Sequence, residues 1–218
     1  MKLVLLHSPL VGPGSWDALA PVLRRRGHDV VVPDLSAIVR GSPPYYLKLA
    51  ALAASVAQDS ILVVHSGAGA LVPAIAARTA VRGAIFVDAL LPHPGKCWFD
   101  TAPPVLNARI RSLARDEMLP PWHRWWPKGA IEALLGEHYE VFAAGLNELP
   151  LAYFEEIAPD IALTTPSAYL QIGAMNAIEA DWAQANGWPV ARLELHHLAM
   201  LTHPDAVAAA ILDLAALL

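Results

Sequence analysis

Short apolar runs alternate with amphipathic stretches along most of this chain, and the alternation predicts its secondary structure. Each run is short, rich in Val, Ile, Leu and Ala, and bounded by turn-forming residues, which indicates a buried strand. The predicted strands are Leu3–Leu6, Val30–Val32, Ile61–Val64, Gly83–Val87, Ser167–Ile172 and Ala191–Leu195. The predicted helices are Trp16–Arg26, Pro44–Ala57, Ala68–Arg78, Ala177–Asn186 and Pro204–Leu217. Wholly apolar strands that alternate with helices predict an α/β fold, a mostly parallel doubly wound sheet covered on both faces.

The pattern changes between residues 93 and 165. This stretch contains Trp98, Trp122, Trp125 and Trp126 and is interrupted by prolines, as in P-P-W-H-R-W-W-P. Because proline breaks helices and marks turns, we expect short helical segments joined by turns. The chain therefore divides into a core, residues 1–92 and 166–218, and an inserted helical cap, residues 93–165.

Composition narrows the possible functions. The chain has 218 residues, a net charge of -5 and only 16% charged residues, which allows one domain with a large core. No basic run is longer than Arg24–Arg26, so a nucleic-acid partner is not expected. Cys97 is the single cysteine, which excludes an intrachain disulfide. The spacing of His196, His197 and His203 has no helical or hairpin rationale for a metal site, so no metal is expected.

The apolar start M-K-L-V-L-L is interrupted by His7 and Pro9. It is too short for a signal peptide or a membrane span, so we expect a cytoplasmic protein with no membrane partner. The high apolar content predicts an apolar pocket and hence an apolar small-molecule substrate. The apolar final helix A-A-A-I-L-D-L-A-A-L-L could pack on the sheet or form a dimer face, which leaves monomer and homodimer both open.

Candidate chemical groups directly follow the predicted strands. Ligands bind at the carboxyl ends of parallel strands. These ends carry His7-Ser8, Asp34, Ser66, Asp88 and His196-His197. Ser66 lies between a buried strand and a small-residue helix start, where a sharp turn would hold its hydroxyl exposed. The N–H of Gly67 at the start of that helix then favours a developing oxyanion, whereas His7 is expected to hydrogen-bond the backbone near the site.

Four segments in this order resemble the α/β-hydrolase superfamily, in particular its small plant-esterase and hydroxynitrile-lyase-like branch and the bacterial members of that branch. The segments are L-V-L-L-H-S-P, V-V-H-S-G-A-G, F-V-D-A-L-L-P and L-H-H-L-A-M-L-T-H-P. The resemblance covers most of the chain. It implies an α/β-hydrolase fold in which Ser66 is the nucleophile and His197 the base, without a cofactor.

Two positions depart from the family pattern. Pro9 has no N–H where the family supplies its second oxyanion donor, so either the Leu10 N–H or the Ser8 hydroxyl is expected in that role. Most of the superfamily places its acid after the strand at 167–172, where this chain has G-A-M-N-A-I-E-A-D. We predict that Asp88, at the end of the preceding strand, is the acid, as in some members of the superfamily.

These residues predict a serine hydrolase that cleaves a small or medium apolar ester, thioester or lactone through an acyl-enzyme. Ser66 attacks the carbonyl, His197 transfers the proton and Asp88 orients His197. The residues expected to line the substrate pocket are Pro9, Leu198, Trp98, Trp122, Trp125 and Trp126.

Two other functions stay open. Hydroxynitrile lyases of the branch carry a hydroxyl residue at the position of Ser8, which favours a non-hydrolytic lyase or cyclase. They also carry a lysine where this chain has Leu198, which argues against that function. A non-catalytic ligand-binding descendant is the third possibility, although a binding protein gains nothing from the retained Ser, Asp and His.

Overall fold

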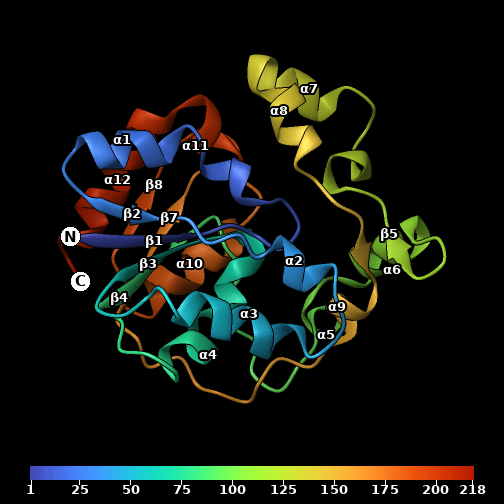
Figure 1. Cartoon of the computed structure of the whole chain (residues 1–218), viewed down its shortest axis with the longest axis horizontal. Helices are drawn as coiled ribbons and strands as arrows, with labels where there is room; N and C mark the ends of the chain where they lie inside the picture. Colours follow the sequence, from blue (N-terminus) through green and yellow to red (C-terminus); the bar gives the residue numbers. More distant parts are fainter.

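The computed structural model describes all residues from 1 to 218 and contains a six-stranded parallel sheet (Figure 1). The strands of this sheet, in spatial order, are β2 (Asp29–Val31), β1 (Lys2–Leu6), β3 (Ile61–His65), β4 (Gly83–Val87), β7 (Ser167–Gln171) and β8 (Val190–Arg192). The predicted strands and the parallel α/β class are confirmed, although β8 ends at Arg192 instead of Leu195. Residues of β3 and β4 are buried throughout, which explains why both are continuous apolar runs.

Helices cover both faces of the sheet. The helices α1 (Leu19–Arg25), α11 (Ala199–Thr202) and α12 (Pro204–Ala215) lie on one side, and α3 (Tyr45–Ala54), α4 (Val72–Ala76) and α10 (Ala177–Ala185) lie on the other (Figure 1). From β1 the chain moves to β2 at one edge of the sheet, and from β2 it moves back past β1 to β3 and then β4. Because connections between parallel strands are right-handed, the helices that connect strands in these two directions lie on opposite faces.

The helix expected over Ala68–Arg78 is divided in two. A 3₁₀ helix spans Ser66–Leu71, and α4 begins only at Val72. Pro73 explains the break, because it has no N–H to continue the hydrogen-bonding pattern and fits best in the first turn of a new helix.

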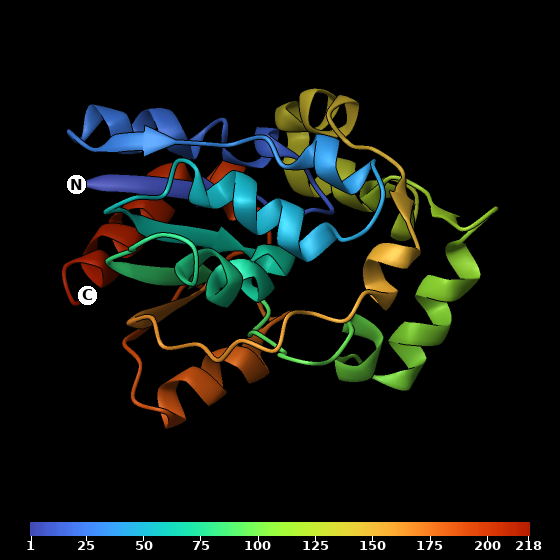
Figure 2. The same cartoon turned by 60° about the horizontal axis from the view of Figure 1, so that its bottom comes forward.

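Residues 93 to 165 connect β4 to β7 through short elements. These are α5 (Trp98–Thr101), α6 (Pro104–Leu113), β5 (Met118–Leu119), α7 (Ala130–Leu135), α8 (Tyr139–Ala144), β6 (Leu149–Pro150) and α9 (Ala152–Glu155). β5 and β6 form an antiparallel pair. Figure 2 shows this segment beyond one end of the sheet, with both termini at the other end. The segment therefore lies over the carboxyl ends of the strands.

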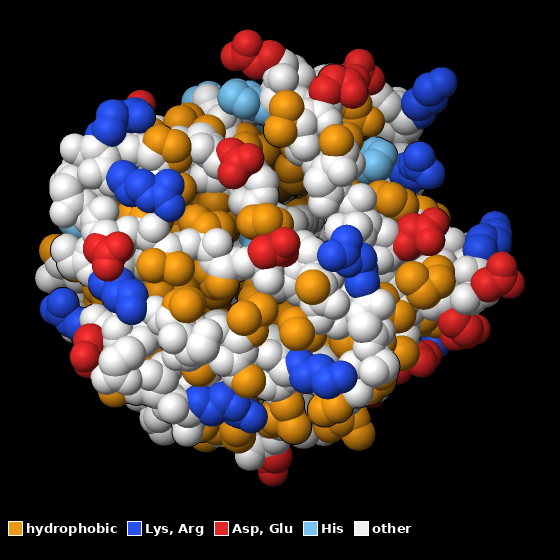
Figure 3. Space-filling view, viewed as in Figure 1, with side chains coloured by type: hydrophobic (Ala, Val, Ile, Leu, Met, Phe, Trp, Pro, Cys, Tyr) orange, Lys and Arg blue, Asp and Glu red, His pale blue; other side chains and the backbone are white.

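Figure 3 shows acidic and basic side chains scattered over one face without an extended patch of either charge. No helix combines the length and the apolar character that crossing a bilayer requires.

Candidate active site

Ser66 occupies a strained turn between β3 and the 3₁₀ helix that follows. Its φ is 52°, in the left-handed region that non-glycine residues seldom adopt. The segment after β4 holds this turn in place, because the Leu90 N–H donates to the Ser66 carbonyl over 3.0 Å. Gly69 permits this contact, since a Cβ at that position would lie 2.0 Å from the Leu90 carbonyl oxygen. The small residues after Ser66 thus serve a close backbone approach.

Asp88 and His197 lie together at the carboxyl ends of β4 and β8. The Nδ1 atom of His197 lies 3.0 Å from Asp88 Oδ2, so a proton on Nδ1 is donated to the carboxylate. The other carboxylate oxygen accepts the N–H of Ile172 over 3.0 Å and that of Gly173 over 3.3 Å. Asp88 is fully buried, and these bonds hold its side chain in place as an acceptor for His197 Nδ1, which fixes the tautomer of His197.

Two buried residues that the sequence did not single out support this pair. Asn176, in the loop where an acid was absent, donates its amide to the Asp88 carbonyl over 2.5 Å. His65 lies 3.0 Å through Nε2 from the His197 carbonyl, and the centroids of the two imidazole rings are 4.5 Å apart. Burial, and next the charge of His197, lower the pKa of His65 well below its ordinary value, so His65 stays neutral. The only sequence signal for His65 was its place directly before Ser66.

The half-buried Ser66 hydroxyl makes no hydrogen bond to the His197 ring. Contacts between a nucleophile and its base are often loose until substrate binds. Asp88 and His197 are therefore preassembled, and Ser66 lies at the end of the neighbouring strand.

Ser8 lies beside Gly67 on the other side of the site. A Cβ placed on Gly67 would be 3.2 Å from Ser8 Oγ and 3.7 Å from Pro9 Cδ, so the two loops are in close contact. The Leu10 N–H donates to Ser8 Oγ over 3.3 Å, which leaves the proton of the Ser8 hydroxyl free to be donated elsewhere. Of the two expected second donors, the geometry favours the Ser8 hydroxyl over the Leu10 N–H.

His7 holds this loop in place, as expected for a structural histidine. Its Nδ1 donates to the Ser8 carbonyl over 2.8 Å, and its Nε2 accepts the Leu35 N–H over 2.9 Å. The ring is neutral, because Nε2 acts as an acceptor and burial lowers the pKa of His7. The 3.8 Å separation between His7 Nε2 and the Asp34 carboxylate is therefore not an ion pair.

The tryptophans expected in the pocket divide into two groups. Trp122 lies near the base, with its ring centroid 6.4 Å from that of His197, and Trp126 packs against Trp122 at 5.5 Å. Trp98 and Trp125 instead pack around Phe154, with centroid distances of 5.2 and 5.9 Å. Of the other two predicted pocket residues, Pro9 lies against Gly67, and Leu198 is fully buried directly after His197.

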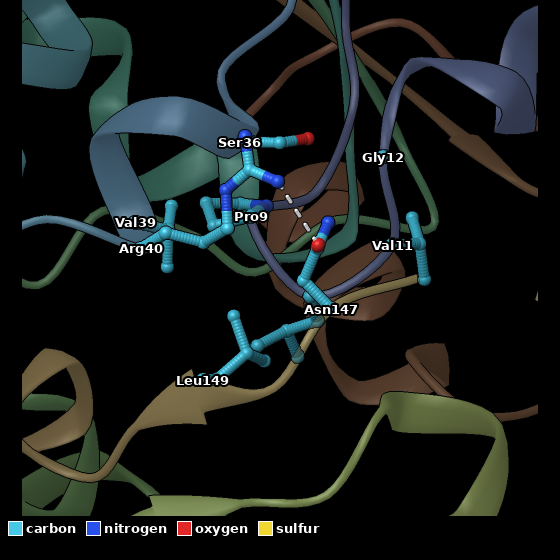
Figure 4. A pocket seen from close by; sticks show the side chains of 9 residues that line it. Pro9, Val11, Gly12, Ser36, Val39, Arg40, Asn147 and Leu149 are labelled. Carbon is cyan, nitrogen blue, oxygen red and sulfur yellow. Dashed lines mark hydrogen bonds between the residues drawn. The ribbon is translucent and has the colours of Figure 1, made fainter. Parts of the chain in front are cut away.

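A groove of about 330 Å³ lies beside the site, between the core loops near Gly12 and Ser36 and the segment around α8. It adjoins a small pocket lined by Pro9 and Leu10, across which Arg40 Nη1 donates to Asn147 Oδ1 over 3.1 Å (Figure 4). Neither space is lined by Ser66 or His197. The groove therefore approaches the side of the site formed by Ser8 and Gly67, called the donor side below. It does not contain Ser66 or His197.

No group of three or more His, Cys, Asp or Glu side chains is arranged to hold a metal ion. The groups that the site presents are the Ser66 hydroxyl, the His197 imidazole and the buried Asp88 carboxylate.

Comparison with known proteins adds to this geometry. Residues 3–210 match the model of the Alpha/beta hydrolase family. No curated protein sequence matches the chain.

Solved structures with a similar fold include three proteins named for different activities. Polyneuridine aldehyde esterase has a TM-score of 0.73 at 16% identity, over 98% of both chains. A pyrethroid hydrolase from Sphingobium faniae JZ-2 has a TM-score of 0.70 at 21% identity, over 98% of this chain and 96% of the other. Tomato methylketone synthase I, complexed with 2-tridecanone, has a TM-score of 0.73 at 18% identity, over 98% and 97%. At such identities the likeness establishes the shared fold.

Proposed function

The chain belongs to the alpha/beta hydrolase family, and from this premise we propose that it is a serine hydrolase. Its substrate would be a small or medium, largely apolar carboxylic ester, thioester or lactone, cleaved through an acyl-enzyme. The observation that carries the proposal is the 3.0 Å contact between His197 Nδ1 and Asp88 Oδ2, beside a serine in the left-handed turn after β3.

The proposed reaction begins with the attack of Ser66 Oγ on the substrate carbonyl carbon. The Ser66 proton moves to Nε2 of His197, and the carbonyl π electrons move to oxygen. The tetrahedral intermediate then collapses, expelling the alcohol or thiol, which takes the proton from His197. Water repeats the sequence on the acyl-enzyme and releases the acid.

Two further features support hydrolysis of an apolar substrate. The Gly67 N–H and the Ser8 hydroxyl lie on the same side of Ser66, where an oxyanion would need donors. Trp122 covers the His197 side, so an acyl or alcohol group at this position would meet an aromatic surface.

A non-hydrolytic reaction is the second candidate. It is supported by Pro9, which lacks the backbone donor, and by the Ser8 hydroxyl beside the nucleophile. Leu198 is fully buried directly after His197, so no cation is available there to stabilise a leaving anion, which disfavours a lyase. Similarity to a synthase of the same fold keeps the alternative worth testing.

The first experiment treats the protein with a fluorophosphonate and measures intact mass, followed by peptide mapping. We expect one adduct, on Ser66, and none on Ser66→Ala. Hydrolysis of p-nitrophenyl butyrate should fall by about 10⁴-fold or more in the same variant, because loss of a triad nucleophile leaves only the residual catalysis of the donors.

Ser60→Ala is the matched control, because Ser60 is a buried serine directly before β3 whose hydroxyl donates only to the Ala57 carbonyl. It should be labelled and active like the wild type. A folded wild type that gives no adduct, or a Ser66→Ala variant that keeps full turnover, would reject the serine mechanism and favour the non-hydrolytic candidate.

A further inference from the structure

The donor side of the site lacks one backbone group. Pro9 has no N–H, and the Leu10 N–H is directed at Ser8 Oγ over 3.3 Å. The chain therefore offers the Gly67 N–H and the Ser8 hydroxyl as donors from the core. An additional donor would have to come from outside the core loops.

Tyr153, on α9, brings a hydroxyl to this side. A Cβ placed on Gly67 would lie 3.9 Å from the Tyr153 hydroxyl oxygen and 3.2 Å from Ser8 Oγ. The Tyr153 side chain is only 4% exposed, yet its hydroxyl makes no hydrogen bond within the chain. The hydroxyl oxygen is not fully enclosed by the protein, and it lies close to Gly67 and Ser8.

The Tyr153 ring is held by aromatic packing. It stacks on Tyr46 with a centroid distance of 6.0 Å and an interplanar angle of 12°. Tyr45 and Phe154 meet its edges at 5.9 and 5.3 Å. Such packing leaves the ring little freedom, so the position of the hydroxyl is fixed before any substrate arrives.

Glu156 ties this part of α9 to the core. Its two carboxylate oxygens accept the N–H groups of Tyr45 and Tyr46 over 2.7 and 2.8 Å. These N–H groups open α3, which has no side-chain cap of its own, so the carboxylate satisfies free donors at the positive end of the helix. Tyr153 therefore belongs to the inserted segment in sequence but is anchored to a core helix.

The protonation state of Tyr153 suits a donor. Burial, and then the neighbouring Tyr46 and Glu156, raise the pKa of Tyr153 well above its ordinary value. The phenol thus keeps its proton at neutral pH.

We propose that the Tyr153 hydroxyl is a catalytic oxyanion donor, alongside the Gly67 N–H and the Ser8 hydroxyl. As Ser66 Oγ bonds to the carbonyl carbon, the electron pair of the broken π bond moves to oxygen, and Tyr153 donates a hydrogen bond to that oxygen without losing its proton. The inference rests on the proposed function and deepens it, because it adds a side chain from the inserted segment to the two donors of the core.

Tyr153→Phe tests the inference, with Tyr45→Phe as the matched control. Both substitutions remove one phenol oxygen from the same aromatic cluster, but the Tyr45 hydroxyl points to the Gly41 carbonyl at 3.4 Å. With p-nitrophenyl butyrate, Tyr153→Phe should lower kcat by about 10²-fold with little change in KM, as for removal of one oxyanion donor. The inhibition constant of a trifluoromethyl ketone should rise by the factor by which kcat/KM falls.

Thermal unfolding separates this from a structural role, because loss of a donor that acts only on substrate leaves Tm at the wild-type value. If kcat of Tyr153→Phe stays within about threefold of the control, well below the loss expected for an oxyanion donor, the inference is wrong while the serine mechanism stands. If Ser66→Ala retains turnover, the proposed function fails first, and the inference fails with it.

Discussion

The two sides of the candidate site differ in how far their polar groups are already satisfied. On the side of His197, both carboxylate oxygens of Asp88 accept hydrogen bonds, and the Asp88 and His197 carbonyls also have partners. On the side of Gly67, the hydroxyls of Ser8 and Tyr153 donate to no group of the chain.

This contrast separates orientation from binding. A saturated network fixes the angle and tautomer of an imidazole without any substrate, and it does so at no further cost when the reaction begins. Donors that are positioned but unused stabilise only the charge that appears in the reaction. Substitutions on the side of His197 should therefore disturb the geometry of its imidazole. Substitutions on the side of Gly67 should mainly remove stabilisation of the transition state.

The largest effect is expected from Asp88→Asn. The amide can still accept the Ile172 N–H, but its NH₂ group would face His197 Nδ1 and impose the wrong tautomer. We expect kcat to fall by about 10⁴-fold, measured with p-nitrophenyl butyrate.

Asp181→Asn is the matched control, because its exposed carboxylate pairs only with Arg192 at 2.8 Å. It should retain wild-type turnover. A folded Asp88→Asn protein with kcat within about tenfold of the control would mean that Asp88 is not the acid, since its removal is expected to cost far more.

A smaller loss is expected from Ser8→Ala on the donor side. Removing one donor should lower kcat by about 10²–10³-fold and leave KM nearly unchanged. Tm should fall only slightly, because the Ser8 oxygen accepts a single 3.3 Å bond from the Leu10 N–H. Steady-state kinetics and thermal unfolding measure these quantities. Ser36→Ala, at the start of the short helix Ser36–Val39, is the control. Equal rates for the two variants would exclude Ser8 as a donor.

The smallest catalytic effect is expected from Asn176→Ala, because this side chain bonds the backbone carbonyl of Asp88 and not a reacting group. It leaves the buried Asp88 carbonyl without its 2.5 Å partner, so the free energy of unfolding should fall by about 1–3 kcal/mol. Urea unfolding measures this, and kcat should change by less than about tenfold because the Asp88 carboxylate keeps both N–H donors.

Asn186→Ala provides the comparison for that measurement, because this exposed asparagine follows the other end of α10 and bonds only the Trp182 carbonyl. Its effect on stability should be much smaller. Equal destabilisation by the two substitutions would show that the Asn176 contact contributes nothing specific.

Most of the sheet could be predicted from the sequence because its central strands β1, β3 and β4 are continuous, mostly apolar runs. The rule that ligand groups follow parallel strands placed Ser66, Asp88 and the His196-His197 pair among the candidates. The resemblance to the α/β-hydrolase superfamily then distinguished Ser66 and His197 from the others. The prediction of helix boundaries was less accurate. The pattern predicted one helix over Ala68–Arg78, whereas Pro73 separates a 3₁₀ helix from α4. It also assigned four tryptophans to one pocket, whereas Trp98 and Trp125 pack around Phe154.

The sequence by itself determined the order of strands and helices and the chemical groups that follow the strands, because periodicity and turn propensity act over a few neighbouring residues. Only the tertiary structure decided which distant groups meet. Asn176 lies 88 positions after Asp88 in the chain, and nothing local indicates that its amide reaches the Asp88 carbonyl. The same holds for Tyr153 beside Gly67, since a hydrogen bond or a donor position depends on separations near 3 Å that only the packed fold sets.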